Sequence, residues 1–421
     1  MSSHDDGAGL PSGRALTAHD DAFRDDPQPI YDTLRARAPR HRDAAYGRIL
    51  LTRYDDVRHV VRDAGFGVDA RRTHGDSYMR RVAGTGVAQS EGETAYEPPL
   101  VLLDDPGHRR IRKLVARAFD PKAVAAMAPR IEAIAAALID AIGDRRAIDF
   151  VTDFAGPLPT QAILVMMGME DAPVADFKRW SEDVLFGYDP HRGPEVQDRL
   201  RRAFVAMGGH FRAAVAARRE QPGDDLISAM VRAQEDGDAL TDLEIVSLCT
   251  QLMVAGNVTT TDLMGNGLHA LLTHPRQLAR LRSEPALMEN AVEEMLRFDC
   301  PITETARIPF ADTHVGDCPV RSGDTLTTSL AAANHDPAMF ADPHAFDLAR
   351  DAKAHLGFGS GIHVCLGAAL ARLETRIGLG AFLEAFPGIG LDPQRPPERR
   401  RLPFFRGFAT LPLRVDRSRQ P

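Results

Sequence analysis

The longest run of apolar positions at helical spacing lies in the second half of the chain and predicts one unusually long helix. A capping box at Thr241-Asp242-Leu243-Glu244 begins it, and Pro275 follows its last residue, Thr273. At 1.5 Å per residue this helix would be about 45–50 Å long. Gly256 lies inside it and Thr259-Thr260-Thr261 follows closely. We therefore expect the backbone hydrogen bonds to open locally at this point.

Further helical patterns occupy most of the remaining chain, and alternating patterns are confined to a few short stretches. The predicted helices are Ile30 to Arg37, Tyr54 to Asp63, Pro121 to Ile142, Leu158 to Met169, Phe177 to Leu185, Leu200 to Arg219, Met288 to Phe298 and Ala368 to Phe386. The predicted strands are Arg48 to Thr52, Thr305 to Pro309, Thr313 to Val315 and Asp324 to Ser329. The patterns predict a mainly α protein with a small β region.

Two segments lack a clear pattern. Residues 1–20 are polar and are expected to form a disordered tail, which leaves residues 21–421 as a single domain. Residues 65–99 are rich in glycine and weakly periodic, and a loop of that length in a compact protein is usually functional or mobile.

Composition and charge restrict the class of protein. The net charge of −8 argues against a general nucleic-acid binder, since phosphate binding requires a basic face. The four cysteines show no CxxC pairing and predict free thiols in a reducing compartment. The polar N-terminus resembles neither a signal peptide nor a membrane anchor, and no apolar run is long enough to cross a membrane. We expect a cytoplasmic protein.

The stretch Phe358-Gly359-Ser360-Gly361-Ile362-His363-Val364-Cys365-Leu366-Gly367 carries the clearest chemistry. Its glycines allow a tight turn and close approach to a flat ligand. It places Cys365 where a helix begins, and a helix N-terminus lowers the pKa of a thiol. A thiolate held in this way can bind haem iron axially. The alternative, a buried cysteine in a glycine-rich loop, does not explain the fixed order of Phe, Gly, His and Cys.

This decamer resembles the cysteine-ligand loop of the cytochrome P-450 superfamily, and the resemblance extends from about Asp26 to Val415. It implies the cytochrome P-450 fold, with haem b between the long central helix and the cysteine-ligand helix. Cys365 would be the metal ligand, and Phe358 and Gly367 of the same loop would contact the cofactor.

The resemblance also implies a set of residues for the haem propionates. His108 and Arg112 are four residues apart and so share one face of a helix, which suits a pair of anionic groups. By itself this pair would more often be a solvated charged face, but it matches the family's His-x-x-x-Arg motif, which favours the propionate site. Arg307 and His363 match two further propionate-binding positions.

The segment Ala255-Gly256-Asn257-Val258-Thr259 resembles the family's oxygen-activation segment. There, small residues such as Ala255 and Gly256 admit dioxygen, and Thr259 would hydrogen-bond it. The family usually has an acid where this chain has Val258. Asp262, one helical turn further on, is expected to replace that acid as a proton relay. Glu304, a substrate group, or Thr259 with water are the alternatives.

Other motifs of the family predict a stabilising cluster and a docking surface. Glu294 and Arg297 form the Glu-x-x-Arg motif, and Arg350 matches its partner; we assign all three to fold maintenance. The basic surface formed by Arg109, Arg110, Lys113 and Arg117 suggests an acidic redox partner or, alternatively, a solvated helix face.

The sequence thus predicts a haem-thiolate monooxygenase that inserts one oxygen atom from O₂ into a small, largely apolar organic substrate. Electrons would come from NAD(P)H through a ferredoxin reductase and a ferredoxin, with no nucleic-acid or membrane partner. A peroxide-using or otherwise atypical P-450 without the usual acid is the alternative enzyme. A non-catalytic P-450-like partner protein is disfavoured by the intact Cys365, His363, Arg112 and Thr259. Phe405 and Phe408 are expected at the floor of the pocket.

Overall fold

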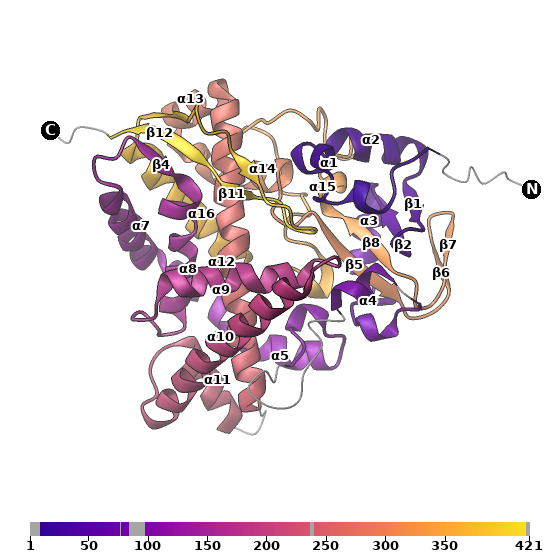
Figure 1. The fold of residues 1–421 in the computed structure, drawn as a ribbon, viewed down its shortest axis with the longest axis horizontal. Coiled ribbons are helices and arrows are strands. Elements are labelled where there is room, and N and C mark those ends of the chain that lie inside the picture. The colour runs from indigo at the N-terminus through magenta and orange to yellow at the C-terminus, as the bar shows by residue number, and fades with distance from the viewer. Residues whose placement is uncertain (1–8, 76, 84–96, 236–239, 418–421) are drawn as a thin grey trace, which may run out of the picture.

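The computed structural model describes residues 9–75, 77–83, 97–235 and 240–417. Most of these residues are helical (Figure 1). The helices are α1 (Asp21–Asp25), α2 (Gln28–Arg37), α3 (Tyr54–Arg62), α4 (Tyr78–Ala83), α5 (Gly107–Val115), α6 (Pro121–Ala125), α7 (Ala128–Ile142), α8 (Pro157–Met166), α9 (Val174–Leu185), α10 (Pro194–Glu220), α11 (Leu226–Glu235), α12 (Asp242–Thr273), α13 (Pro275–Ser283), α14 (Met288–Phe298), α15 (Leu330–Ala333) and α16 (Ala368–Ala385).

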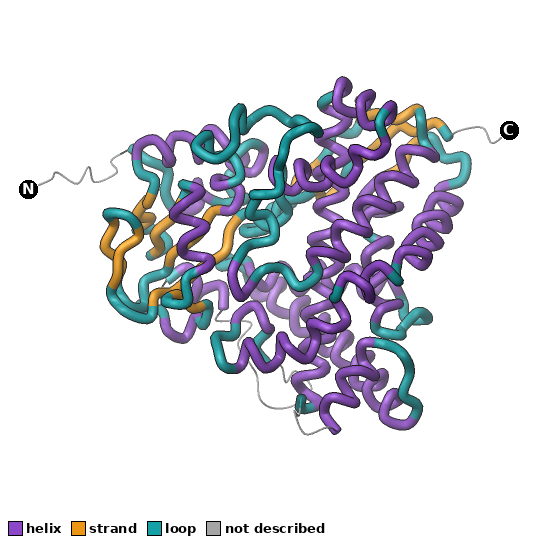
Figure 2. The backbone as a smooth tube through the Cα atoms, turned by 180° about the vertical axis from the view of Figure 1, so that it is seen from behind, coloured by secondary structure: helices purple, strands orange, loops and turns teal. Residues whose placement is uncertain are grey.

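The strands are short and belong to four small sheets. They are β1 (Arg40–Asp43), β2 (Arg48–Leu51), β3 (Phe66–Gly67), β4 (Ala147–Asp149), β5 (Glu304–Pro309), β6 (Thr313–Val315), β7 (Cys318–Val320), β8 (Leu326–Ser329), β9 (Gly388–Leu391), β10 (Glu398–Arg399), β11 (Phe408–Thr410) and β12 (Pro412–Asp416). The largest sheet has the order β1-β2-β8-β5-β3, with β2 and β8 parallel. It therefore joins strands from the first 70 residues to strands from residues 304–329, and Figure 2 shows these strands together on the N-terminal side of the molecule.

Helix α12 is the centre of the helical part. It packs against α8, α9, α10, α14 and α16, and Figure 1 shows it running through the middle of these helices. Its apolar residues belong to the largest hydrophobic core of the protein. No helix in the described part of the chain combines the length and apolarity needed to cross a membrane. The predicted mainly α fold with a small β region is confirmed.

The predicted capping box of α12 is present, but the predicted opening of the helix is not. The Glu244 amide donates to Thr241 Oγ1 at 3.1 Å, and the Thr241 amide donates to Glu244 Oε2 at 2.7 Å. The helix then continues unbroken for 32 residues. The hydroxyls of Thr259 and Thr261 donate to the carbonyls of Ala255 and Asn257, at 2.5 and 2.9 Å, and the backbone remains helical beneath them.

The N-terminal segment is more ordered than its composition suggests. Residues 1–8 lie outside the described part, but Gly13–Leu16 forms a 3₁₀ turn and Leu16 is buried. The Asp43 carboxylate accepts hydrogen bonds from the Ser12 hydroxyl at 2.6 Å and the Gly13 amide at 2.9 Å. The expectation of a disordered tail through residue 20 is wrong for residues 13–20, because these long-range contacts hold the segment.

The long, weakly periodic stretch of residues 65–99 is described only in part. Residues 76 and 84–96 lie outside the described residues, and the part before residue 84 forms β3 and α4.

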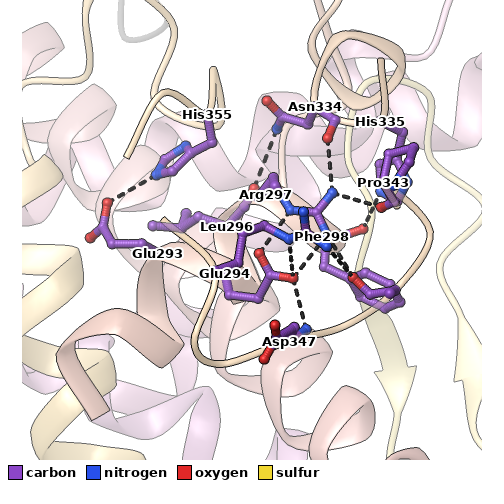
Figure 3. A network of polar contacts seen from close by, with 12 residues as sticks. Glu293, Glu294, Leu296, Arg297, Phe298, Asn334, His335, Pro343, Asp347 and His355 are labelled. Atoms are coloured by element: carbon purple, nitrogen blue, oxygen red, sulfur yellow. Dashed lines mark hydrogen bonds and ion pairs between the residues drawn. The ribbon is translucent and has the colours of Figure 1, made fainter. Parts of the chain in front are cut away.

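A buried charge cluster holds the segment that leads to the cysteine loop. Arg297 contacts Glu294 at 2.8 Å, and Arg350 Nε donates to Glu294 Oε1 at 3.3 Å. Arg297 also donates to the carbonyls of Asn334 and Pro343, at 3.0 and 2.7 Å (Figure 3). Glu294 and Arg297 have no exposed side-chain surface. These contacts agree with the assignment of Glu294, Arg297 and Arg350 to fold maintenance.

Candidate active site

A cavity of about 400 Å³ lies between α12 and the beginning of α16. Its walls come from α5, α12, β5, the loop before α16 and the C-terminal loop around Phe404 and Phe405. Leu252 and Val254 line it, whereas Met253 is fully buried in the neighbouring core. Phe405 lies on the wall as expected. Phe408 does not, because it packs in the core against His269.

The cysteine loop is shaped by two glycines in left-handed conformation. Gly359 has φ of 69° and Gly361 has φ of 72°, which disfavour residues with a side chain. A Cβ at Gly361 would also lie 2.6 Å from the carbonyl oxygen of Val61. The amide of Cys365 donates to the carbonyl of Phe358 at 2.9 Å and closes the loop. As a result, Cys365 lines the cavity just before the first turn of α16.

The Cys365 thiol has a raised pKa, contrary to the expectation from its place near a helix N-terminus. Burial disfavours the thiolate and outweighs the Gly367 amide and the Arg112 guanidinium, which both favour it. A bound metal ion changes this balance, since a coordinating thiol is deprotonated by the metal itself. The Cys365 side chain is exposed at the cavity, so despite its raised pKa the thiol is accessible to a metal that would deprotonate it.

Four basic side chains gather on one side of the cavity: His108 and Arg112 from α5, Arg307 from β5, and His363 from the cysteine loop. The rings of His108 and His363 lie 4.3 Å apart. Burial lowers the pKa of all four side chains, to about 10 for Arg307 and about 3 for His363. The proximity of Arg112 to His108, and of Arg307 to His363, adds to this lowering.

This basic cluster has the properties of a site for a dianion. The Nε2 atom of His108 is buried without a hydrogen-bond partner. Among the described residues, the only ion pair of these four side chains joins His108 to Asp105, with Nδ1 and Oδ1 3.6 Å apart. Two carboxylates would supply the missing charge and acceptors. The residues thus fit the propionates of a haem whose iron meets Cys365, and the site is that of a haem-thiolate protein.

Helix α12 presents Ala255, Gly256 and Thr259 to the cavity, as the sequence predicts. Asp262 is not among the lining residues. It is buried on another face of α12, with Oδ1 3.1 Å from Arg400 Nη2, and burial raises its pKa to about 6. Val258 also packs in the core. The interpretation of Asp262 as the proton relay is wrong on this geometry, because the face that it shares with Val258 points away from the cavity.

A different acid reaches the cavity. Glu374, on α16, lines the cavity beside the Thr260 side chain of α12, which favours the ionised carboxylate. Burial raises its pKa well above the usual value for a glutamate. The sequence analysis did not identify Glu374. The available signal was an acid within the helix that follows Cys365, four residues after the apolar Leu370 and so on the same face of that helix.

Comparisons with known proteins agree with this site. Residues 191–415 match the sequence family Cytochrome P450. The cytochrome P450 monooxygenase PikC of Streptomyces venezuelae is 38% identical over 94% of this chain and 93% of its own length. The 6-deoxyerythronolide B hydroxylase of Saccharopolyspora erythraea is 36% identical over 94% of this chain and 98% of its own. The structure of myxobacterial cytochrome P450 CYP267B1 in complex with myristic acid has a TM-score of 0.85 at 35% identity, covering 97% of this chain and 100% of that one.

The chain therefore belongs to the cytochrome P450 family. It is a haem-thiolate monooxygenase, an oxidoreductase that incorporates oxygen from O₂ into small-molecule substrates. The cofactor that this family implies is haem, and the residues described above fit it.

Proposed function

We propose that the protein is a cytosolic enzyme that uses haem b to hydroxylate or epoxidise a small, largely apolar organic molecule, with electrons delivered by a ferredoxin and its NAD(P)H-dependent reductase. The observation that carries this proposal is that Cys365, before α16, and Thr259, on α12, line one cavity. The aliphatic lining of that cavity, with Leu252 and Val254 on α12, supports an apolar substrate.

In this proposal Cys365 ligates the iron, and His108, Arg112, Arg307 and His363 hold the two propionates. Phe358 and Gly367 flank the ligand, and the guanidinium of Arg372 lies 4.5 Å from the centre of the Phe358 ring. Bound haem would supply the redox and oxygen-transfer chemistry, which no side chain of the protein can supply. The protein's part is ligation, orientation and control of protons.

Protons would reach the cavity through Glu374 and Thr260 rather than through Asp262. The raised pKa of Glu374 favours the protonated carboxyl group, which could donate a proton, and the Thr260 hydroxyl lies beside it. Thr259, the neighbouring residue of α12, donates its own hydrogen to the carbonyl of Ala255, so its oxygen can accept a hydrogen bond from a donor in the cavity. Ala255 and Gly256 leave space beside this hydroxyl.

The basic surface of α5 and the following turn supports docking of an acidic ferredoxin. Arg109, Arg110, Lys113 and Arg117 are all exposed there. Arg109 pairs with Asp105 at 2.6 Å and Arg110 pairs with Glu244. Arg112, on the same helix, donates to the carbonyl of Val364 beside the cysteine. A partner on this surface would approach the cysteine side of the cofactor.

The test is spectroscopic and needs no substrate. The purified holoprotein is reduced under carbon monoxide, and a thiolate ligand is expected to give the red-shifted Soret band of the family. The cofactor is then extracted, and its mass is measured to identify it as haem b. A carbonyl band without the red shift, or a different cofactor mass, would contradict the proposal. Peroxide-supported turnover without ferredoxin would favour the peroxide-using alternative.

A further inference from the structure

One buried carboxylate on the cavity wall has no part in the chemistry above. Glu304, the first residue of β5, is 5% exposed and lines the cavity. Within the described part of the chain, its only hydrogen-bond donor is Arg48 Nη1, at 3.2 and 3.4 Å from its two oxygens. A carboxylate offers about four lone-pair sites, so the protein leaves most of this acceptor capacity unused.

The charge of Arg48 is shared between two acids. Its Nε donates to Asp43 Oδ2 at 3.0 Å, and its Nη2 donates to the carbonyl of Leu16 at 3.3 Å. The Arg48 and Asp43 side chains have no exposed surface. When both acids are ionised, the cluster of Asp43, Arg48 and Glu304 carries two negative charges and one positive charge. The excess charge is buried, where an unpaired charge is costly.

The two acids of this cluster titrate differently. The pKa of Asp43 is lowered, because Arg48, the Ser12 hydroxyl and the Gly13 amide together outweigh burial. Burial raises the pKa of Glu304, and the attraction of Arg48 only partly offsets it. Asp43 therefore keeps the charge of Arg48, and Glu304 is the carboxylate on the cavity wall whose ionised form a further cation would stabilise.

The surroundings of Glu304 also favour a cation. Tyr188, Phe404 and Phe405 line the cavity, and aromatic faces attract positive charge. The ring of Tyr78 stacks on Phe404, with centroids 5.2 Å apart, and its hydroxyl is buried without a hydrogen-bond partner. Glu304 is the strongest charge acting on that hydroxyl. An occupant that carries N–H donors and a positive charge would satisfy the Glu304 carboxylate and meet the aromatic rings of the lining, whereas an anion would not.

We propose that Glu304 is a specificity-determining residue that binds a protonated amine of the substrate and so fixes which carbon of its apolar body faces Thr259. The inference rests on the proposed function, namely that this cavity is the substrate pocket. Arg48 is a positioning residue: it holds the carboxylate in place and favours its ionised form, whereas Asp43 competes for the same guanidinium.

The experiment uses three ligands with the same decyl chain: N,N-dimethyldecylamine, decan-1-ol and decanoic acid. Each is titrated calorimetrically into the haem-loaded protein at neutral pH, after the red-shifted carbonyl band has been verified. The carbonyl band tests the proposed function, and the order of affinities tests this inference, so the two can fail separately. We expect the amine to bind about tenfold or more tightly than the alcohol, and the acid to bind most weakly.

The variant Glu304→Gln should remove the preference for the amine and leave the affinity for decan-1-ol within about twofold. Glu182→Gln is the matched control, since Glu182 lies on α9 outside the cavity lining; it should keep the wild-type order. Equal affinity of the wild-type protein for amine and alcohol would overturn the inference, whether or not Glu304→Gln folds. So would an unchanged preference in Glu304→Gln, or an amine that binds through its nitrogen to the iron, as seen in the Soret band.

Discussion

The carboxyl group of Glu374 on the cysteine helix α16 lies beside the hydroxyl of Thr260 on the central helix α12, and both side chains line the cavity. This arrangement places a titratable group next to Thr259 although the residue before Thr259 is a valine. In the proposed function, Glu374 is the candidate for the acid that Val258 does not supply.

If Glu374 delivers protons, Glu374→Gln should lower the yield of product per NAD(P)H consumed. A positioned acid typically contributes 10²–10⁴-fold, so we expect product formation to fall by about 10² while NAD(P)H is still consumed and peroxide is released. Asp262→Asn is the control, since it makes the same chemical change on a side chain outside the cavity, and its coupling should match the wild type. The opposite pattern would restore Asp262 as the relay.

Cys365→Ser should abolish the red-shifted carbonyl band and turnover, because a hydroxyl is a weak ligand that supplies none of the electron density of a thiolate. Haem content and far-ultraviolet circular dichroism should be recorded in parallel to show that the protein is folded. A red-shifted band in a folded Cys365→Ser protein would mean that another residue is the ligand.

The docking surface can be tested by charge reversal at Lys113 and Arg117, which are both exposed. The double variant to glutamate should slow reduction by ferredoxin, and the difference from wild type should shrink as salt is raised, because the Debye length falls from about 10 Å at 0.1 M to about 3 Å at 1 M. Arg276→Glu on α13, at the far end of the molecule from α5 in Figure 1, should have no effect. Equal loss in both variants would argue against a defined surface.

The cluster around Glu294 should be essential for stability. Glu294→Ala leaves the fully buried Arg297 charge without its carboxylate, and breaking such a pair costs about 3–5 kcal/mol. We expect a large fall in the urea midpoint and poor haem retention. Glu289→Ala, on the same helix, removes an exposed carboxylate 4.0 Å from Arg376 and should cost less than about 0.5 kcal/mol. Similar midpoints for the two variants would contradict this account.

Asp262 should make the stability depend on pH. Its pKa is about 6 in the folded protein, above the ordinary value of 3.8, so folding favours its protonated form. This contribution is present below about pH 4 and is lost as pH rises through 6, a change of about 3 kcal/mol for a shift of about two units. Asp262→Asn should therefore gain stability relative to wild type between pH 4 and 7, as measured by urea unfolding. A difference between the two proteins that does not change with pH would contradict this expectation.

The local pattern of residues along the chain was sufficient to predict several elements of this protein and its metal ligand. The limits of α12 follow from the capping box at Thr241 and from Pro275, and the turn at Gly359 and Gly361 follows from residues that tolerate positive φ. The order of residues around Cys365 was specific enough to indicate the ligand and the family, because few other arrangements require that order.

Tertiary structure decided how these elements face one another. The helical period places Val258 and Asp262 on one face of α12, but it does not show which face meets the cavity. The structure shows that Asp262 does not line the cavity and that Glu374, on another helix, does. The pKa of Cys365 depended on burial, which outweighed the local effect of the helix N-terminus. Arg48 and Glu304 are 256 residues apart, and only the pairing of β2, β8 and β5 in one sheet brings their charges together.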